Sequence, residues 1–130
     1  MRLHYSIMFL ITALLYSCNG NNKVLTYDDY PVYDGTDLEL TYSPTASKFK
    51  LWAPTADDVK LLLYDNGDEG SATEIVDMYK SDNGTWEIEI KENLKGKFYT
   101  FQLKIGEKWL DETPGMWVKA TGINGKRAAI

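Results

Sequence analysis

The sequence predicts an all-β domain, an antiparallel β-sandwich, and three features of the chain lead to this prediction. From residue 37 onward, apolar side chains recur at every second position, which is the spacing of half-buried strands. These runs are short, and turn-forming sequences separate them at intervals of about 8–12 residues. No window carries the apolar stripe of an amphipathic helix. About seven short strands of this kind are typical of two antiparallel sheets packed face to face.

Each predicted strand has one apolar face, which we expect to point into the core, while its polar neighbours point outward. Glu39, Glu87 and Glu89 are examples of such outward positions. The residues expected to face the core are Leu38, Leu40 and Tyr42; Phe49, Leu51 and Ala53; Val59, Leu61 and Leu63; Val76 and Met78; Trp86, Ile88 and Ile90; and Tyr99, Phe101, Leu103 and Ile105.

Turn signals place the strand boundaries. The Asp-Asn-Gly sequence at residues 82–84 is a strong turn signal. Residues 106–108 predict a tight reversal, after which Trp109 and Leu110 begin a returning strand. Residues 128–130 read as the start of another apolar strand, so we expect the polypeptide to continue beyond this chain.

Composition narrows the kinds of chemistry that are expected. With 130 residues the chain is long enough for one domain, and its net charge of −5 comes without a basic patch, so nucleic acid is not an expected partner. His4 is the only histidine, and it lies in the segment expected to be removed. Cys18 is the only cysteine, which excludes a disulfide within one chain.

Residues 1–17 have the organisation of a secretory signal. Arg2 supplies the positive charge, and an apolar run follows over residues 7–16 that is too short to cross a bilayer. The segment ends in the sequence Leu-Tyr-Ser-Cys at residues 15–18, which resembles the lipobox of bacterial lipoproteins. The resemblance implies lipidation of Cys18 after removal of residues 1–17. It also implies a protein anchored to a membrane of the bacterial cell envelope, facing the periplasm or the cell surface. Residues 18–29 are then expected to form a flexible tether.

Residues 49–61, with the sequence FKLWAPTADDVKL, are the most specific stretch of the chain. They resemble the opening signature of the Ig-like module that precedes the catalytic barrel of starch-debranching enzymes, a module of the family-48 carbohydrate-binding group. Residues 30–35 and 122–127 narrow the resemblance to type I pullulanases, which act on the α-1,6 branch points of pullulan, glycogen and starch. The three segments together place the module at residues 30–130.

The resemblance implies an accessory role for this chain rather than catalysis. Glycoside hydrolysis needs two carboxyl groups at a fixed separation in a cleft. In pullulanases these groups lie on a catalytic barrel, which alone takes about 250 residues, so no catalytic residue is expected here. The expected partners are therefore a barrel in the same polypeptide and branched α-glucan.

The resemblance also implies a place for glucan. In glycogen-binding members of the group a tryptophan at a hairpin tip stacks on glucose, and Trp109 matches this position. A second stacking tryptophan usually follows the strand that corresponds to residues 59–64, but here residues 65–67 are Asp-Asn-Gly, with only Tyr64 nearby. The expected glucan-binding residues are Trp109, Tyr64 and Gln102, with weak binding because one platform is missing.

Two further sets of residues have open interpretations. Trp52 lies on the strand face opposite Phe49 and is expected, with Trp117, to pack against a neighbouring domain.

No metal site is expected, and no cofactor. The acidic residues of the loop after residue 64 could coordinate calcium, an ion that prefers oxygen ligands, although their spacing matches no known loop motif. These acidic residues are Asp65, Asp68 and Glu69.

Two alternative functions remain open at this stage. The first is a free-standing surface lipoprotein that captures starch or glycogen through Trp109 and Tyr64. The second is an Ig-like domain that binds a protein partner. Retention on insoluble starch separates the first from the second.

Overall fold

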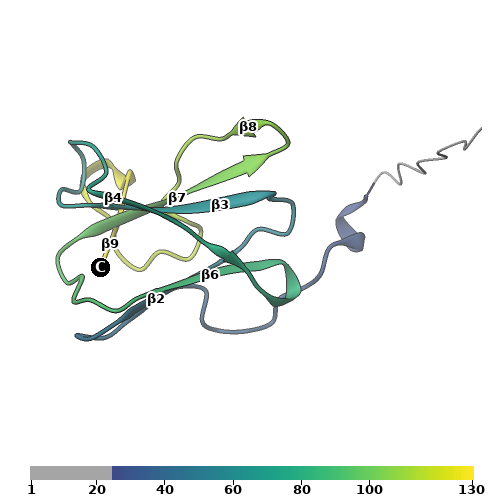
Figure 1. The fold of residues 1–130 in the computed structure, drawn as a ribbon, viewed down its shortest axis with the longest axis horizontal. Helices are drawn as coiled ribbons and strands as arrows, with labels where there is room; N and C mark the ends of the chain where they lie inside the picture. The colour runs from purple at the N-terminus through teal and green to yellow at the C-terminus, as the bar shows by residue number, and fades with distance from the viewer. Residues whose placement is uncertain (1–24) are drawn as a thin grey trace, which may run out of the picture.

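The computed structural model describes residues 25–130, and the predicted signal segment with Cys18 lies outside the described residues. Two antiparallel sheets lie one above the other in Figure 1, with the C-terminus between them. The first sheet has the strand order β1 (Glu39–Tyr42), β2 (Ser47–Trp52), β6 (Thr85–Ile90) and β5 (Tyr79–Lys80). The second has the order β4 (Glu74–Asp77), β3 (Asp58–Tyr64), β7 (Phe98–Ile105) and β8 (Lys108–Trp109), and β9 (Ala128–Ala129) also pairs with β7.

The remaining regular elements are single turns of 3-10 helix. They are η1 (Tyr27–Asp29), η2 (Asp82–Gly84) and η3 (Ile123–Gly125). Within residues 25–130 there is no helix long and apolar enough to cross a membrane. The predicted all-β class with antiparallel sheets is therefore confirmed for the described part of the chain.

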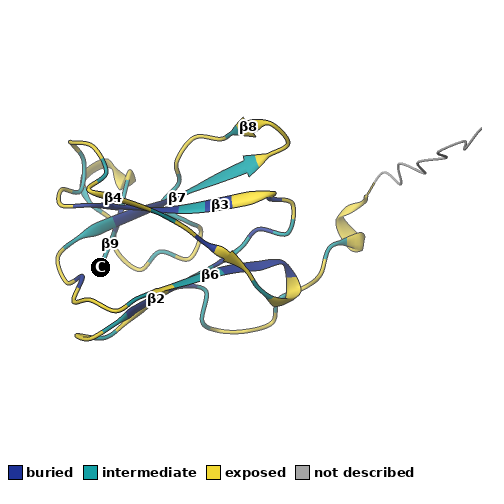
Figure 2. Cartoon of the chain, viewed as in Figure 1, coloured by how far each residue is buried: buried dark blue, intermediate teal, exposed yellow. Residues whose placement is uncertain are grey.

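Aromatic side chains from both sheets join the two layers. Phe49 of β2 contacts Tyr99 of β7 edge to face, with ring centroids 5.1 Å apart. Tyr99 in turn contacts Phe101 in the same way at 5.4 Å. All three side chains are fully buried, and the dark blue segments in Figure 2 show that burial concentrates along the middle of the facing strands. Edge-to-face pairs of this kind contribute about 0.5–1.5 kcal/mol beyond their buried area.

Strand alternation follows the sequence prediction over most of the core. Phe49 and Leu51 of β2 are buried, as are Val59, Leu61 and Leu63 of β3. The turn at residues 82–84 is also confirmed, with Asn83 and Gly84 both at positive φ. The returning strand expected at Trp109 forms β8, which ends before Leu110, and the apolar strand expected from Ala128 forms β9.

The face of β3 that was expected to point outward is buried at its C-terminal half. Leu62 and Tyr64 are buried, although they alternate with the core residues of the same strand. β3 is flanked by β4 and β7, and the chain that follows β8 returns over this region, where Arg127 stacks on the ring of Tyr64. When a strand is covered on both faces, its sequence is a continuous apolar run rather than an alternation of apolar and polar residues.

The prediction for Glu39 is wrong, because this residue is buried rather than outward-facing. Its exposed fraction is only 3%. The backbone at Glu39 has a φ of 72°, a left-handed conformation that interrupts the extended geometry on which alternation depends. The carboxylate accepts hydrogen bonds from the backbone N–H groups of Met116 and Trp117, at 3.1 and 3.3 Å. Glu39 therefore ties β1, the edge of the first sheet, to the loop that follows β8 at the edge of the second.

Candidate functional site

The outer face of the second sheet brings two of the three predicted glucan-binding residues onto one surface. Lys60 of β3 lies opposite Gln102 of β7 in the strand register, and Lys104 of β7 lies opposite Trp109 of β8. Cross-strand partners share a face of a sheet, as do alternate residues of one strand, so these side chains all point to the same side. We call Lys60, Gln102 and Trp109 together the Trp109 face.

Hairpin geometry positions the ring at the edge of this face. Gly106 has a φ of 59°, which permits the tight reversal between β7 and β8. The ring of Trp109 is half-buried, and the ammonium of Lys60 lies 4.6 Å from its centroid. The Nε2 group of Gln102 donates to the carbonyl of Leu110 at 3.0 Å. Trp109 is thus held beside a cation and an anchored carboxamide.

Tyr64, the third predicted glucan-binding residue, occupies a different environment. Its exposed fraction is 2%, and the guanidinium of Arg127 lies 3.6 Å from the ring centroid. The phenol donates to the carboxylate of Glu112, and Thr100 donates to the same carboxylate at 2.8 Å. Burial is the main cause that raises the pKa of Tyr64, and the bond to Glu112 adds to it. The ring leaves no free face for a sugar, so we retain Trp109 and Gln102 as glucan-binding candidates.

Besides covering the ring of Tyr64, Arg127 binds the loop that follows β3. Its guanidinium donates to three backbone carbonyls of the loop after β3, each at 2.7 Å. These carbonyls belong to Asn66, Glu69 and Gly70. The loop at residues 65–67 stands where other members of the group have a second stacking tryptophan. It is therefore held in place by Arg127 of the C-terminal segment.

The acidic side chains of this loop do not gather into a metal site. Asp65 forms an ion pair with Lys97 at 2.7 Å. Among residues 25–130 no group of three or more His, Cys, Asp or Glu side chains is placed to hold a metal ion. The calcium interpretation of Asp65, Asp68 and Glu69 therefore gains no geometric support.

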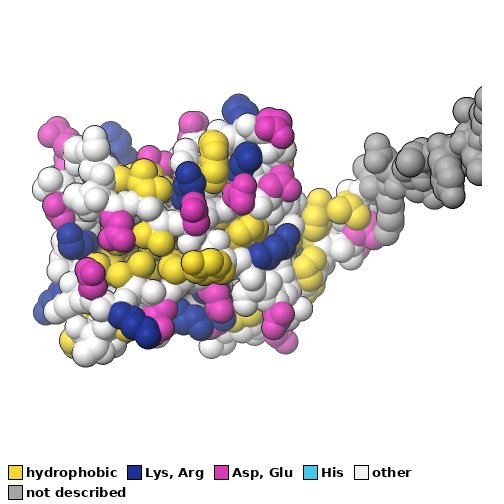
Figure 3. All heavy atoms as spheres, in the orientation of Figure 1, with side chains coloured by type: hydrophobic (Ala, Val, Ile, Leu, Met, Phe, Trp, Pro, Cys, Tyr) yellow, Lys and Arg dark blue, Asp and Glu magenta, His cyan; other side chains and the backbone are white. Residues whose placement is uncertain are grey.

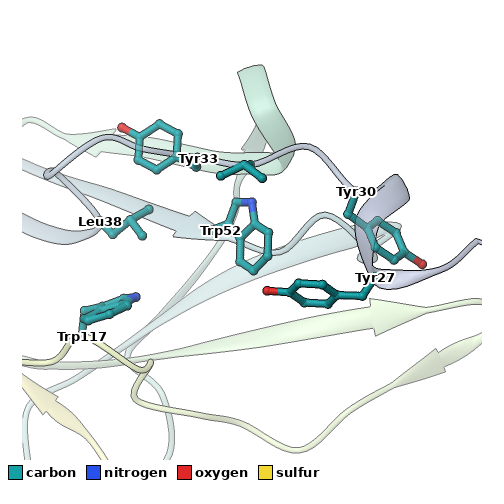
Figure 4. Close-up of a pocket in the computed structure, with 7 residues that line it drawn as sticks. Tyr27, Tyr30, Tyr33, Leu38, Trp52 and Trp117 are labelled. Carbon is teal, nitrogen blue, oxygen red and sulfur yellow. The ribbon is translucent and has the colours of Figure 1, made fainter.

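A second surface, an aromatic hollow of about 240 Å³, lies beside the segment that leads into β1. Figure 4 shows Trp52 at its centre, with Tyr27 and Tyr30 on one side and Trp117 with Leu38 on the other. The indole N–H of Trp52 lies 3.2 Å from the carbonyls of both Pro31 and Asn83. Trp52 therefore uses its polar atom within the module and presents ring surface to the hollow.

The lead-in segment is held against β2 by a polar cluster. The ammonium of Lys50 forms an ion pair with Asp37 at 2.7 Å, and the phenol of Tyr33 also donates to that carboxylate. Hydrogen bonds from Lys50 and Tyr33 lower the pKa of Asp37, and the bond to Asp37 raises the pKa of Lys50. These bonds fix one wall of the hollow.

The rim of the hollow is apolar and open to solvent. Trp117 is 65% exposed, and Met116 beside it is 88% exposed. Figure 3 shows hydrophobic side chains where the lead-in leaves the body of the sheets and a further row of them across the middle of this face, with charges of both signs around them. Exposed apolar surface of this kind makes the hollow a candidate contact site.

The sequence profile of carbohydrate-binding module 48 (isoamylase N-terminal domain) matches residues 37–116, more than half of the chain. The chain belongs to this family. The match covers both sheets from β1 to β8 and the loop with Met116, so the Trp109 face and Trp52 lie within the family-48 fold.

Individual relatives of this family-48 chain are pullulanases. The pullulanase of Bacillus subtilis (strain 168) is 26% identical over 83% of this chain. Among solved structures, a mutant pullulanase of Paenibacillus barengoltzii complexed with maltotriose is 40% identical over 79% of the chain, with a TM-score of 0.75. The pullulanase of Bacillus acidopullulyticus is 37% identical over 76%, with a TM-score of 0.71. The predicted resemblance to the family-48 module of pullulanases is confirmed.

The chain corresponds to a small part of each of these relatives. It spans 14% of the Bacillus subtilis protein, 16% of the Paenibacillus barengoltzii chain and 12% of the Bacillus acidopullulyticus chain. The similarity therefore concerns one module of much longer proteins.

The sequence does not predict the roles of two residues of the family-48 module, one on the Trp109 face and one buried beneath the loop that carries Trp117. Lys60 was expected only to alternate with core residues, and nothing in one sequence shows that its ammonium reaches Trp109 on β8, two strands away. Glu39 supports Trp117 from a buried position. A signal for Glu39 was present in its apolar surroundings, but the left-handed backbone that turns it inward was not predictable.

Proposed function

We propose that this chain is the non-catalytic, carbohydrate-binding accessory module of a pullulanase-type debranching glycoside hydrolase. The observation that carries the proposal is the membership of residues 37–116 in carbohydrate-binding module 48, together with pullulanases as relatives. In this proposal the module contacts branched α-glucan such as pullulan, glycogen or starch. It also packs on a catalytic domain of the same polypeptide.

The strand order supports the Ig-like form of the sandwich. Counting strands along the chain, the first, second, sixth and fifth form one sheet, and the third and seventh pair at the centre of the other. The first sheet thus has the order of strands A, B, E and D of the immunoglobulin fold, and β3, β7 and β8 correspond to strands C, F and G, with β4 as an additional strand beside β3.

The two surfaces support different parts of the proposal. The Trp109 face offers an indole ring with polar groups beside it, a combination suited to a sugar, whose C–H face is apolar and whose rim is polar. The aromatic hollow, with Trp52 and Trp117, is suited to a protein contact, because tryptophan and tyrosine dominate interface energetics. A free-standing glucan binder is less well supported, since the relatives named above are far longer than this chain.

Glucan retention tests the carbohydrate-binding part of the proposal. We expect the chain to be retained on insoluble starch and the Trp109→Ala variant to lose most of this retention, because the variant removes the ring on which a sugar would stack. Trp117→Ala is the matched control, since it removes an exposed indole from the other surface. Failure of the unaltered chain to bind starch or soluble maltooligosaccharides would leave only a structural role for the module.

Membrane retention tests the proposed lipid anchor. We expect the Cys18→Ser variant to appear in the soluble fraction of cells in which the unaltered chain sediments with membranes, because serine cannot form the thioether. Stable anchoring needs two or more acyl chains, which the proposed lipidation would supply. The measurement is the distribution of each protein between membrane and soluble fractions. Equal membrane retention of both proteins would rule out Cys18 as the anchor.

A further inference from the structure

The ammonium of Lys60 has an unusual position on the outer face of the second sheet. Asp77 of β4 is its direct cross-strand neighbour, yet none of the ion pairs formed within residues 25–130 involves Lys60. The ammonium instead lies 4.6 Å from the ring centroid of Trp109. A lysine that lies on an aromatic ring rather than beside a nearby carboxylate keeps its N–H donors available to a ligand.

The side chain of Lys60 reaches Trp109 by crossing the strand between them. β3 and β8 flank β7, so their backbones are separated by roughly 10 Å, twice the spacing of neighbouring strands. Gln102 lies on β7 directly opposite Lys60, so the lysine stem passes beside it. Lys60, Gln102 and Trp109 therefore form one continuous surface.

The three side chains offer complementary chemistry. Trp109 presents a flat apolar ring, and Lys60 presents a cationic donor above it. Gln102 uses its Nε2 group to donate to Leu110, which leaves its carbonyl oxygen to accept a hydrogen bond from a ligand. A pyranose ring carries an apolar C–H face bordered by hydroxyl groups that both donate and accept, and this surface matches each of those features.

Lys104, a second lysine on the same face, has its ammonium in an ion pair and so does not offer its N–H donors to a ligand in the same way. Lys104 lies opposite Trp109 in the register, but its ammonium pairs with Asp58 at 3.6 Å. The positive charge available at the ring is therefore that of Lys60.

We propose that Lys60 is a glucan-binding residue, whose ammonium donates to the hydroxyl oxygens of the glucose unit that stacks on Trp109. This inference rests on the proposed glucan-binding function and deepens it. Lys60 compensates for the second aromatic platform, whose expected place at residues 65–67 is the Asp-Asn-Gly loop that Arg127 fixes. The site therefore combines one stacking contact with one charged hydrogen-bond donor.

Titration calorimetry of the full chain with maltohexaose tests the role of Lys60. We expect Lys60→Met to weaken binding about ten-fold, because methionine keeps an apolar stem at the ring but removes a charged hydrogen-bond donor. Lys60→Arg should stay within about three-fold of the unaltered chain, since a guanidinium also lies on aromatic rings and donates. Lys108→Met is the matched control. It removes one lysine charge next to Trp109 in sequence but on the opposite face, and should leave binding unchanged.

The possible outcomes separate this inference from the proposed function. Binding by Lys60→Met that equals or exceeds that of the unaltered chain would overturn the role of Lys60, and tighter binding would show that the ammonium competes with sugar for the ring. Loss of binding in Trp109→Ala together with unchanged binding in Lys60→Met would retain the glucan site and reject only this inference. No binding by the unaltered chain would reject both. Circular dichroism of each variant shows whether the fold is retained.

Discussion

Replacement of Glu39 by alanine is expected to destabilise the module by about 2 kcal/mol, which is the scale of hydrogen bonds to a charged acceptor. For a domain of this size such a loss lowers the melting temperature by about 10 °C. The variant removes the acceptor of the N–H groups of Met116 and Trp117 and so detaches their loop from β1. Thermal unfolding followed by circular dichroism measures the effect.

Replacement of Glu39 by glutamine separates the contribution of its hydrogen bonds to stability from the contribution of its negative charge. Burial raises the pKa of Glu39, and the bonds from Trp117 and Met116 lower it to a smaller extent. The other carboxylate oxygen is buried without a hydrogen-bond partner among the described residues. Glutamine keeps a carbonyl oxygen for both N–H groups and carries no charge. We therefore expect Glu39→Gln to be at least as stable as the unaltered chain at pH 7.

The difference in stability between Glu39→Gln and the unaltered chain depends on pH, and the sign of this dependence follows from the raised pKa of Glu39. A raised pKa means that the folded protein binds the proton of Glu39 more tightly than the unfolded chain does. The contribution of Glu39 to stability is therefore greatest below its unfolded pKa of about 4.3 and declines as the pH rises through the folded value. The advantage of Glu39→Gln should shrink on acidification. A Glu39→Gln variant as unstable as Glu39→Ala at pH 7 would show that the negative charge itself is needed to hold the loop.

The hydrophobic alternation of the sequence was sufficient to predict the core and most of the strands. Phe49, Tyr99 and Phe101 were placed on inward faces, and the structure brings Phe49 into contact with Tyr99 across the two sheets and Tyr99 into contact with Phe101 along β7. These predictions succeeded because burial in a two-layer sheet depends on side-chain period, which one sequence displays directly.

The errors arose where contacts distant in sequence override the local pattern. Tyr64 is buried because Arg127, far along the chain, covers its ring. Glu39, which begins β1 with a left-handed backbone, is buried where its carboxylate accepts hydrogen bonds from Met116 and Trp117, far along the chain. The position of Lys60 over Trp109 likewise depends on a strand order that the sequence does not specify. Fold class and the tryptophans of both candidate surfaces were therefore predictable from the sequence, whereas the side chains gathered around those tryptophans required the tertiary structure.

The rim of the aromatic hollow should make the isolated module self-associate. Met116, Trp117, Val32 and Tyr27 are all largely exposed, and three of them line the hollow itself. We propose that a catalytic domain in the same polypeptide covers this surface, so its absence leaves a contiguous apolar patch in contact with water. We expect residues 24–130 to fold, to sediment as species larger than a monomer and to bind a hydrophobic dye.

Variants of the rim connect this behaviour to the hollow. Replacing Met116 and Trp117 by serine should reduce both dye binding and association, because it removes the most exposed apolar groups of the loop. The replacement keeps the backbone N–H groups that donate hydrogen bonds to Glu39. Ile75→Ser on β4 is the matched control, since this isoleucine is also exposed but does not line the hollow. Extending the chain by a catalytic domain should suppress both signals. A monodisperse module that binds no dye would instead show that the hollow needs no covering domain, and would favour a free-standing glucan binder.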